Sequence, residues 1–262
     1  MSIARFSSAA VLSAALAACG GDVGSGSVGG SNTPPPVTSA PAGLYLGYFQ
    51  EDAANDPLDP RPGAFTLNLP AVGGALAGRM NFADGTCPAS STATVTGTRT
   101  AVDIAAAFTG SVDDATVAGT LAGTFDAATL AFTGGSYAVT DGKQARSVPP
   151  CPAYTIAGSG SWELFPVDRN FPLAFTVRVT GRIVSWVPIT GASTSLVYVI
   201  DPAVAQASGD PMVWQGRVGV ALSAAVPSTV NLQTGREYVA AVALADASRM
   251  RVAFASQRFT AP

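Results

Sequence analysis

The sequence predicts an all-β protein made of two strand-rich domains, and three observations carry this prediction. Apolar and polar residues alternate with period two through most of the chain after residue 43. The links between these segments are short and turn-like, as at Asp84-Gly85 and Asp113-Asp114. Of the 262 residues, 48% are hydrophobic and 12% are charged, which excludes a mainly disordered chain and a highly charged coiled coil.

The first residues are typical of an export signal. Arg5 precedes an apolar stretch from Phe6 to Ala18, which is shorter than the roughly 20 residues that a membrane-spanning helix needs. A basic start, a short apolar run and small residues at its end are the features of a secretory signal peptide.

The end of this stretch, Leu16-Ala17-Ala18-Cys19-Gly20, resembles the lipobox of bacterial lipoproteins. The resemblance implies that residues 1–18 are removed and that Cys19 carries a diacylglyceryl thioether and an N-acyl chain such as palmitate. The membrane is then a partner through this anchor. Because Gly20 rather than Asp follows the cysteine, the same resemblance favours a lipid-anchored protein of the outer membrane, on its periplasmic or surface face. The alternative is an ordinary signal-peptide cut that has a cysteine nearby by chance.

Residues 19–43 form a segment rich in Gly, Ser, Thr and Pro, including Pro34-Pro35-Pro36. Such a composition cannot bury a core, so we expect a disordered tether that holds the folded part off the membrane.

The first domain, residues 44–167, is predicted to be an eight-stranded antiparallel meander that closes into a barrel. Glycines recur on the apolar faces, at Gly119, Gly123, Gly158 and Gly160, and inward glycines let a sheet curl until it closes. The segments with the alternating pattern are residues 44–50, 65–69, 76–82, 92–99, 102–108, 117–125, 130–139 and 156–164.

The spacing of glycines in this meander is similar to that of the small barrels of bacterial surface lipoproteins. The residues that carry the similarity are Phe108-Thr109-Gly110, Gly119-Thr120-Leu121-Ala122-Gly123 and Phe132-Thr133-Gly134. Gly-spaced strands occur in many barrels, so the similarity implies the architecture and assigns no binding residue.

Two cysteines remain once Cys19 is assigned to the lipid. In an oxidising compartment Cys87 and Cys151 are expected to form a disulfide, which would stabilise the fold by about 4 kcal/mol in the chain-entropy model. The alternative is a pair of free buried thiols. The sequence has no Cys-x-x-Cys motif, which argues against catalytic disulfide exchange.

The second domain, residues 168–262, is predicted to hold seven strands, at residues 175–179, 183–188, 195–200, 212–215, 228–232, 237–244 and 251–256. Trp186, Gly191-Ala192 and the run from Leu232 to Val242 resemble a fibronectin type III domain. The resemblance implies a two-sheet sandwich in which Tyr238 makes a corner hydrogen bond and Leu232 packs on Trp186. The chain departs from the family at Gln233-Thr234, where a proline often precedes the glycine. Domains of this type are usually spacers or binding modules.

The composition excludes several kinds of chemistry. The chain has no histidine, which excludes Ser-His-Asp and Cys-His catalysis and every His-ligated metal site. Lys143 lies in a polar turn, which does not suit a Ser-Lys dyad, and the acidic loop at residues 51–59 is typical of turns rather than of a calcium site. A net charge of −3 argues against nucleic acid as a partner. We therefore predict no catalysis, no cofactor and no bound metal.

The predicted function is binding or scaffolding in the cell envelope, with an envelope protein or a glycan as partner. Trp214 is the candidate for an exposed binding residue, because tryptophan often dominates interfaces. The alternative function is transport of a small ligand inside the barrel, since an eight-stranded barrel either holds one small ligand or fills with side chains. Inward glycines leave room for a ligand, whereas inward rings such as Trp162 take it up.

Overall fold

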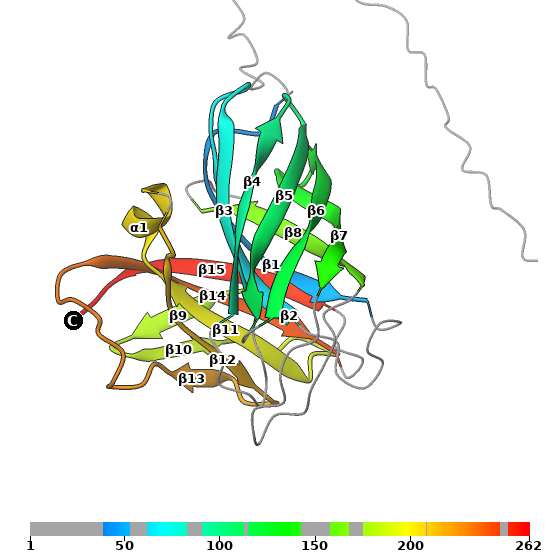
Figure 1. Cartoon of the computed structure of the whole chain (residues 1–262). Helices are drawn as coiled ribbons and strands as arrows, with labels where there is room; N and C mark the ends of the chain where they lie inside the picture. Colours follow the sequence, from blue (N-terminus) through cyan, green and yellow to red (C-terminus); the bar gives the residue numbers. More distant parts are fainter. Residues whose placement is uncertain are drawn as a thin grey trace, which may run out of the picture. The chain divides into compact units, whose positions relative to one another are not determined.

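The structure, a computed structural model, describes residues 39–52, 62–82, 91–112, 115–142, 158–167, 175–207, 209–246 and 251–262. Its described part is all-β, with one short helix (Figure 1). The first eight strands are β1 (Gly43–Glu51), β2 (Pro62–Leu69), β3 (Ala75–Phe82), β4 (Ser91–Arg99), β5 (Asp103–Val112), β6 (Ala115–Asp126), β7 (Ala131–Gly142) and β8 (Ser159–Pro166).

These eight strands form a closed antiparallel barrel (Figure 1). Each strand pairs with the next one along the chain, and β8 pairs back with β1, with Gly47 opposite Leu164. The predicted eight-stranded meander barrel is confirmed. Inward side chains, among them Tyr45, Phe65 and Trp162, make one buried cluster inside it.

Seven strands follow in two sheets. They are β9 (Val177–Thr180), β10 (Ile183–Trp186), β11 (Thr194–Ile200), β12 (Met212–Val218), β13 (Ser223–Ala225), β14 (Glu237–Ala245) and β15 (Arg251–Thr260). One sheet has the order β13-β10-β9 and the other β12-β11-β14-β15. Val184 and Trp186 of the first sheet share one hydrophobic cluster with Val197 and Val242 of the second, so the inner faces of the two sheets build a common core.

The fifth of these strands lies at Ser223–Ala225, so the predicted strand at residues 228–232 is wrong. Pro227 has no backbone N–H to give to a ladder. The guanidinium of Arg182 donates to the carbonyl oxygens of Val226 and Val230, at 3.1 and 2.6 Å, and also to that of Pro227. These carbonyls are therefore fixed by a side chain instead of by a neighbouring strand.

A short helix, α1 (Pro202–Gln206), was not expected from the strand pattern. Its N-cap is Asp201, whose Oδ1 accepts hydrogen bonds from the backbone N–H groups of Ala203 and Val204, at 3.0 and 3.3 Å. Pro202 occupies the first helical position, where its missing N–H costs nothing. An Asp-Pro pair is thus the local signal that starts this helix.

A third apolar cluster joins the outside of the barrel to the four-stranded sheet, and we call it the seam. From the barrel it takes outward side chains of β1 and β2, and from the sheet it takes side chains of β11, β14, β15 and α1. Its buried members are Leu44, Leu46, Tyr48 and Ala64 on the barrel side and Leu196, Tyr198, Ile200, Ala205, Val239, Ala241, Ala243 and Phe254 on the side of the sheet and α1.

The seam explains why three strands are buried on both faces. In β1, Leu44, Leu46 and Tyr48 face the seam, while Tyr45 and Phe49 face the barrel interior. The strands β11 and β14 likewise divide their side chains between the seam and the core shared by the two sheets. The barrel and the two sheets accordingly belong to one compact unit.

Candidate binding surface

The barrel interior is occupied by interlocking aromatic rings. Tyr45 and Phe132 meet edge to face with centroids 5.6 Å apart, and Phe65 and Trp162 do so at 5.5 Å. Trp162 is fully buried, and its Nε1–H donates to the carbonyl oxygen of Ser136 at 2.8 Å. Aromatic pairs of this geometry stabilise a fold by more than the area they bury. These rings therefore act as a packed core.

The inward glycines of the barrel are covered by these rings. A Cβ atom placed on Gly123 would lie 2.4 Å from the Trp162 ring, and one on Gly135 would lie 2.3 Å from it. In the same way, a Cβ on Gly119 would come within 2.3 Å of the Phe108 ring. Gly119 and Gly123, which were predicted to curl the sheet, therefore also make room for large side chains, and rings fill the space beside them.

Trp214 lies in β12 and is half-buried. Its ring packs against the core of the two sheets and covers Gly216, where an added Cβ would lie 2.8 Å from the ring. Most of the ring is thus used inside the protein, so Trp214 offers a partner only part of its surface.

An uncharged recess, lined by both apolar and hydroxyl side chains, lies at one end of the two sheets and has a volume of about 190 Å³. It is lined by Trp186 at the end of β10, by Leu244 near the end of β14, and by residues 188–189, 192–195 and 219–222 of the loops and strand starts around them. None of these lining residues is ionisable, and Thr194 uses its hydroxyl to donate to the carbonyl oxygen of Val218 at 3.2 Å.

The margin of this recess carries exposed apolar side chains. Val220 is 84% exposed, and Leu222 is 44% exposed. Val187, next to two lining residues in the chain, is 49% exposed. Sequence reasoning missed this surface, although one signal was present: Val220-Ala221-Leu222 is an apolar run inside a loop, where polar residues are the rule. The recess suits contact with an apolar group, and its lining holds no acid or base for catalysis.

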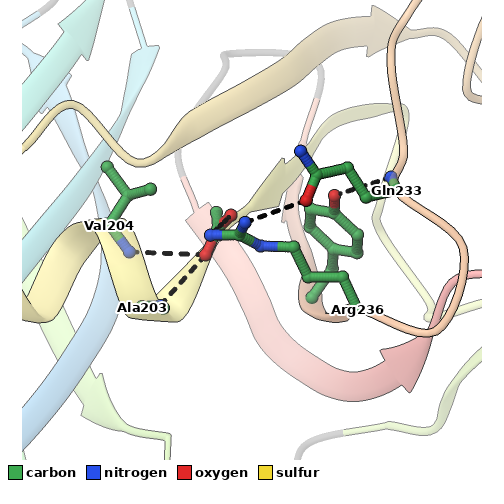
Figure 2. A network of polar contacts seen from close by, with 6 residues as sticks. Ala203, Val204, Gln233 and Arg236 are labelled. Carbon is green, nitrogen blue, oxygen red and sulfur yellow. Dashed lines mark hydrogen bonds and ion pairs between the residues drawn. The ribbon is translucent and has the colours of Figure 1, made fainter.

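A polar network fixes the helix and the corner next to it (Figure 2). Arg236 pairs with the carboxylate of Asp201 at 2.6 Å and donates to Oε1 of Gln233 at 3.0 Å. The backbone N–H of Gln233 in turn donates to the hydroxyl of Tyr238 at 2.9 Å. Asp201 is both helix cap and ion-pair partner, so these charges serve the fold and leave no free acid at this place.

At one end of the barrel, Tyr137 lies near two acids. Burial, together with the nearby carboxylates of Glu51 and Asp52, raises the pKa of Tyr137 far above its ordinary value. Ser159 donates from its hydroxyl to the carboxylate of Asp52 at 2.5 Å. The described residues contain no group of three or more His, Cys, Asp or Glu side chains that could hold a metal ion.

The other predicted sites, Cys19, Cys87 and Cys151, lie outside the described residues, as does Lys143, for which no catalytic role was predicted. The structure therefore does not place the predicted lipidation site or the predicted disulfide.

No protein-family model matches the chain, and neither the curated proteins nor the solved structures contain a significant match. Within the ranges that the structure describes, no helix has the length and apolar character needed to cross a membrane.

Proposed function

We propose that this chain is a lipid-anchored protein of the bacterial cell envelope that binds or supports a partner without catalysis. The anchor and the location rest on the sequence from Leu16 to Gly20. The observation that carries the binding role is the pairing of a filled barrel with an uncharged recess on the neighbouring sheets. A solid barrel suits a supporting body, and an uncharged recess with an exposed apolar margin suits a contact surface.

The packing of the barrel favours this role over transport of a small ligand. Ligand pockets commonly have about 300–1,000 Å³ of space. In the barrel, rings occupy the places beside Gly119, Gly123 and Gly135 where a ligand would need room.

The second half of the proposal is that residues 168–262 form a fibronectin type III-like sandwich. Two observations support it. The strand orders β13-β10-β9 and β12-β11-β14-β15 match a seven-stranded sandwich with three strands in one sheet and four in the other. The Tyr238 hydroxyl, at the start of β14, accepts a hydrogen bond from the backbone of Gln233, as in the tyrosine corner of such domains. Leu232 and Trp186 pack in the same core.

The anchor is tested by replacing the predicted lipid acceptor. Cys19→Ala should move the protein from the membrane fraction to the soluble fraction, and mass analysis of the unaltered protein should show acyl chains on Cys19. We also propose the outer membrane as its location, on the basis of Gly20. A Cys19→Ala protein that still partitions with detergent would contradict the anchor.

The predicted disulfide is part of the same proposal. The connection from β3 to β4 contains Cys87, and that from β7 to β8 contains Cys151. Since both connections join strands at the same end of a meander barrel, a bond between the two cysteines is compatible with the topology. Non-reducing peptide mapping should find Cys87 joined to Cys151, and two free thiols would overturn this point.

The binding role is tested at the recess. A lipid-free form of the protein should capture an envelope protein or a glycan from envelope extracts, and Val220→Asp should weaken that capture at least about tenfold, because it places a charge on the apolar margin. Val72→Asp is the matched control, since Val72 is also exposed, at 59%, but lies in the turn between β2 and β3. Equal loss in both variants, or no loss in either, would exclude the recess as the contact surface.

A further inference from the structure

The segment just before β1 is built into one end of the barrel. Ala40 is 3% exposed and belongs to the buried cluster of the barrel interior. Its backbone N–H donates to the carbonyl oxygen of Ala101, in the turn between β4 and β5, at 2.9 Å. The hydroxyl of Tyr45 donates to the carbonyl oxygen of Pro41 at 3.0 Å. This segment is therefore held in two ways: the Ala40 side chain packs inside the barrel, and the backbone of Ala40 and Pro41 is hydrogen-bonded.

Arg99 is the centre of these contacts. Its guanidinium donates to the carbonyl oxygens of Ala40 at 2.6 Å, Pro70 at 2.9 Å and Thr100 at 3.1 Å. Each acceptor comes from a different part of the chain: the segment before β1, the turn after β2 and the turn after β4. One side chain thus ties together three pieces of backbone at the same end of the barrel.

Arg99 is a buried cation, and its burial is unfavourable unless hydrogen bonds compensate it. The residue is 5% exposed, and no carboxylate pairs with it in the part of the chain that the structure describes. Burial lowers the pKa of Arg99 from its ordinary value. Taking a cation out of water costs several kcal/mol unless hydrogen bonds compensate it, so removing an acceptor such as the Ala40 carbonyl leaves a buried charge short of partners.

Gly43 is the first residue of β1, where the segment joins the barrel. Its φ is +141°, a conformation that other residues rarely adopt. Val102 and Leu130, in two turns at the same end, pack on the cluster that contains Ala40.

We infer that residues 39–42 form a strap that closes this end of the barrel, that Arg99 locks it, and that the chain before residue 39 therefore leaves the protein from one fixed point. The inference does not depend on the lipid anchor. If the chain is anchored at Cys19, the anchor is connected to a defined end of the barrel, the end with the turns at residues 70–74 and 100–102.

Hydrogen exchange on the full chain tests the strap. The amide of Ala40 should be protected in the unaltered protein, and Arg99→Gln should speed its exchange by about 10- to 100-fold, the effect of losing a hydrogen bond to a charged group. Arg99→Lys should behave similarly, because one ammonium cannot reach three carbonyl groups in the way the planar fork does. Arg178→Gln is the matched control, since Arg178 is exposed on β9, and it should change nothing at Ala40.

The location of the change separates a strap from general destabilisation. The strap predicts faster exchange at Ala40 with little change at the β6 amides. Equal acceleration at both places, or an Ala40 amide that exchanges as fast as in a free peptide, would overturn the inference. If Arg99→Gln fails to fold, Tyr45→Phe removes the hydrogen bond to the Pro41 carbonyl and keeps the ring, and it should still speed exchange at Ala40 more than at β6. An unchanged ratio between the two sites would again overturn it.

Discussion

The hydroxyl of Tyr198 donates a hydrogen bond to the backbone carbonyl oxygen of Gly47 at 2.6 Å. Tyr198 belongs to β11 and Gly47 to β1, so this bond crosses the seam from the sheet to the barrel wall. Tyr198 is fully buried. At Gly47 an added Cβ would lie 1.7 Å from the backbone oxygen of Glu163, so only glycine lets β1 and β8 approach this closely.

Tyr198→Phe should destabilise the protein by about 1 kcal/mol, since it removes one buried hydrogen bond and keeps the ring. The measurement is the free energy of unfolding from urea titration. An unchanged midpoint would mean that the bond across the seam contributes nothing to stability.

Two buried tyrosines predict a loss of stability in alkali. Burial raises the pKa of Tyr198 well above its ordinary value, and burial and two acids raise that of Tyr137. In the unfolded chain both groups ionise near pH 10, whereas in the folded protein they stay protonated to higher pH. Their contribution is therefore complete below about pH 10 and declines as the pH rises above it.

The urea concentration at the midpoint of unfolding should accordingly decrease as the pH is raised from about 10 to about 12. In a protein with both Tyr137→Phe and Tyr198→Phe, the midpoint should fall less steeply over this range. The same slope in the double variant would show that other groups cause the alkaline loss.

The glycines under the rings should not tolerate a methyl group. Gly123→Ala would place its Cβ against the Trp162 ring, and overpacking of this kind costs about 1–3 kcal/mol. Gly219→Ala is the control, because nothing lies within 4 Å of a Cβ there, and it should be neutral. Comparable melting temperatures for the two variants would contradict the account of a filled barrel.

Asp201 has two roles that substitution can separate. Asp201→Asn keeps an oxygen for the N–H groups of Ala203 and Val204 but removes the charge that pairs with Arg236, and should cost less than about 1 kcal/mol. Asp201→Ala removes both contacts and should cost about 1–2 kcal/mol. Equal losses in the two variants, measured by thermal unfolding, would show that the ion pair matters more than the cap.

Much of the barrel was predictable because its strands are half-buried. Alternation in β5 and β6, with Ile104 and Leu121 inward and Thr120 exposed, is the direct consequence of one apolar face. The seam was not predicted, because its strands do not alternate between apolar and polar residues. The runs Leu44-Tyr45-Leu46 and Leu196-Val197-Tyr198 are continuously apolar, which is the pattern of strands covered on both faces.

The short strand β13 and the recess could not be predicted, because they depend on long-range contacts that the periodicity of the sequence does not show. The strand at Ser223–Ala225 is only three residues long, and its position is decided partly by Arg182, which lies more than forty residues earlier. The recess depends on which apolar side chains remain uncovered after folding, and Val220 differs from buried valines only in its surroundings.

The central claim is that the barrel and the two sheets form one body, in which a filled barrel supports a binding surface on the sheets. The most direct measurement is hydrogen exchange at rising denaturant, followed at amides of β6 in the barrel and of β10 in the three-stranded sheet. Leu46→Ala, at the seam, should lower the opening free energy of both sets by the same amount, about 2–5 kcal/mol. A fall confined to the barrel, with β10 unchanged, would contradict the claim.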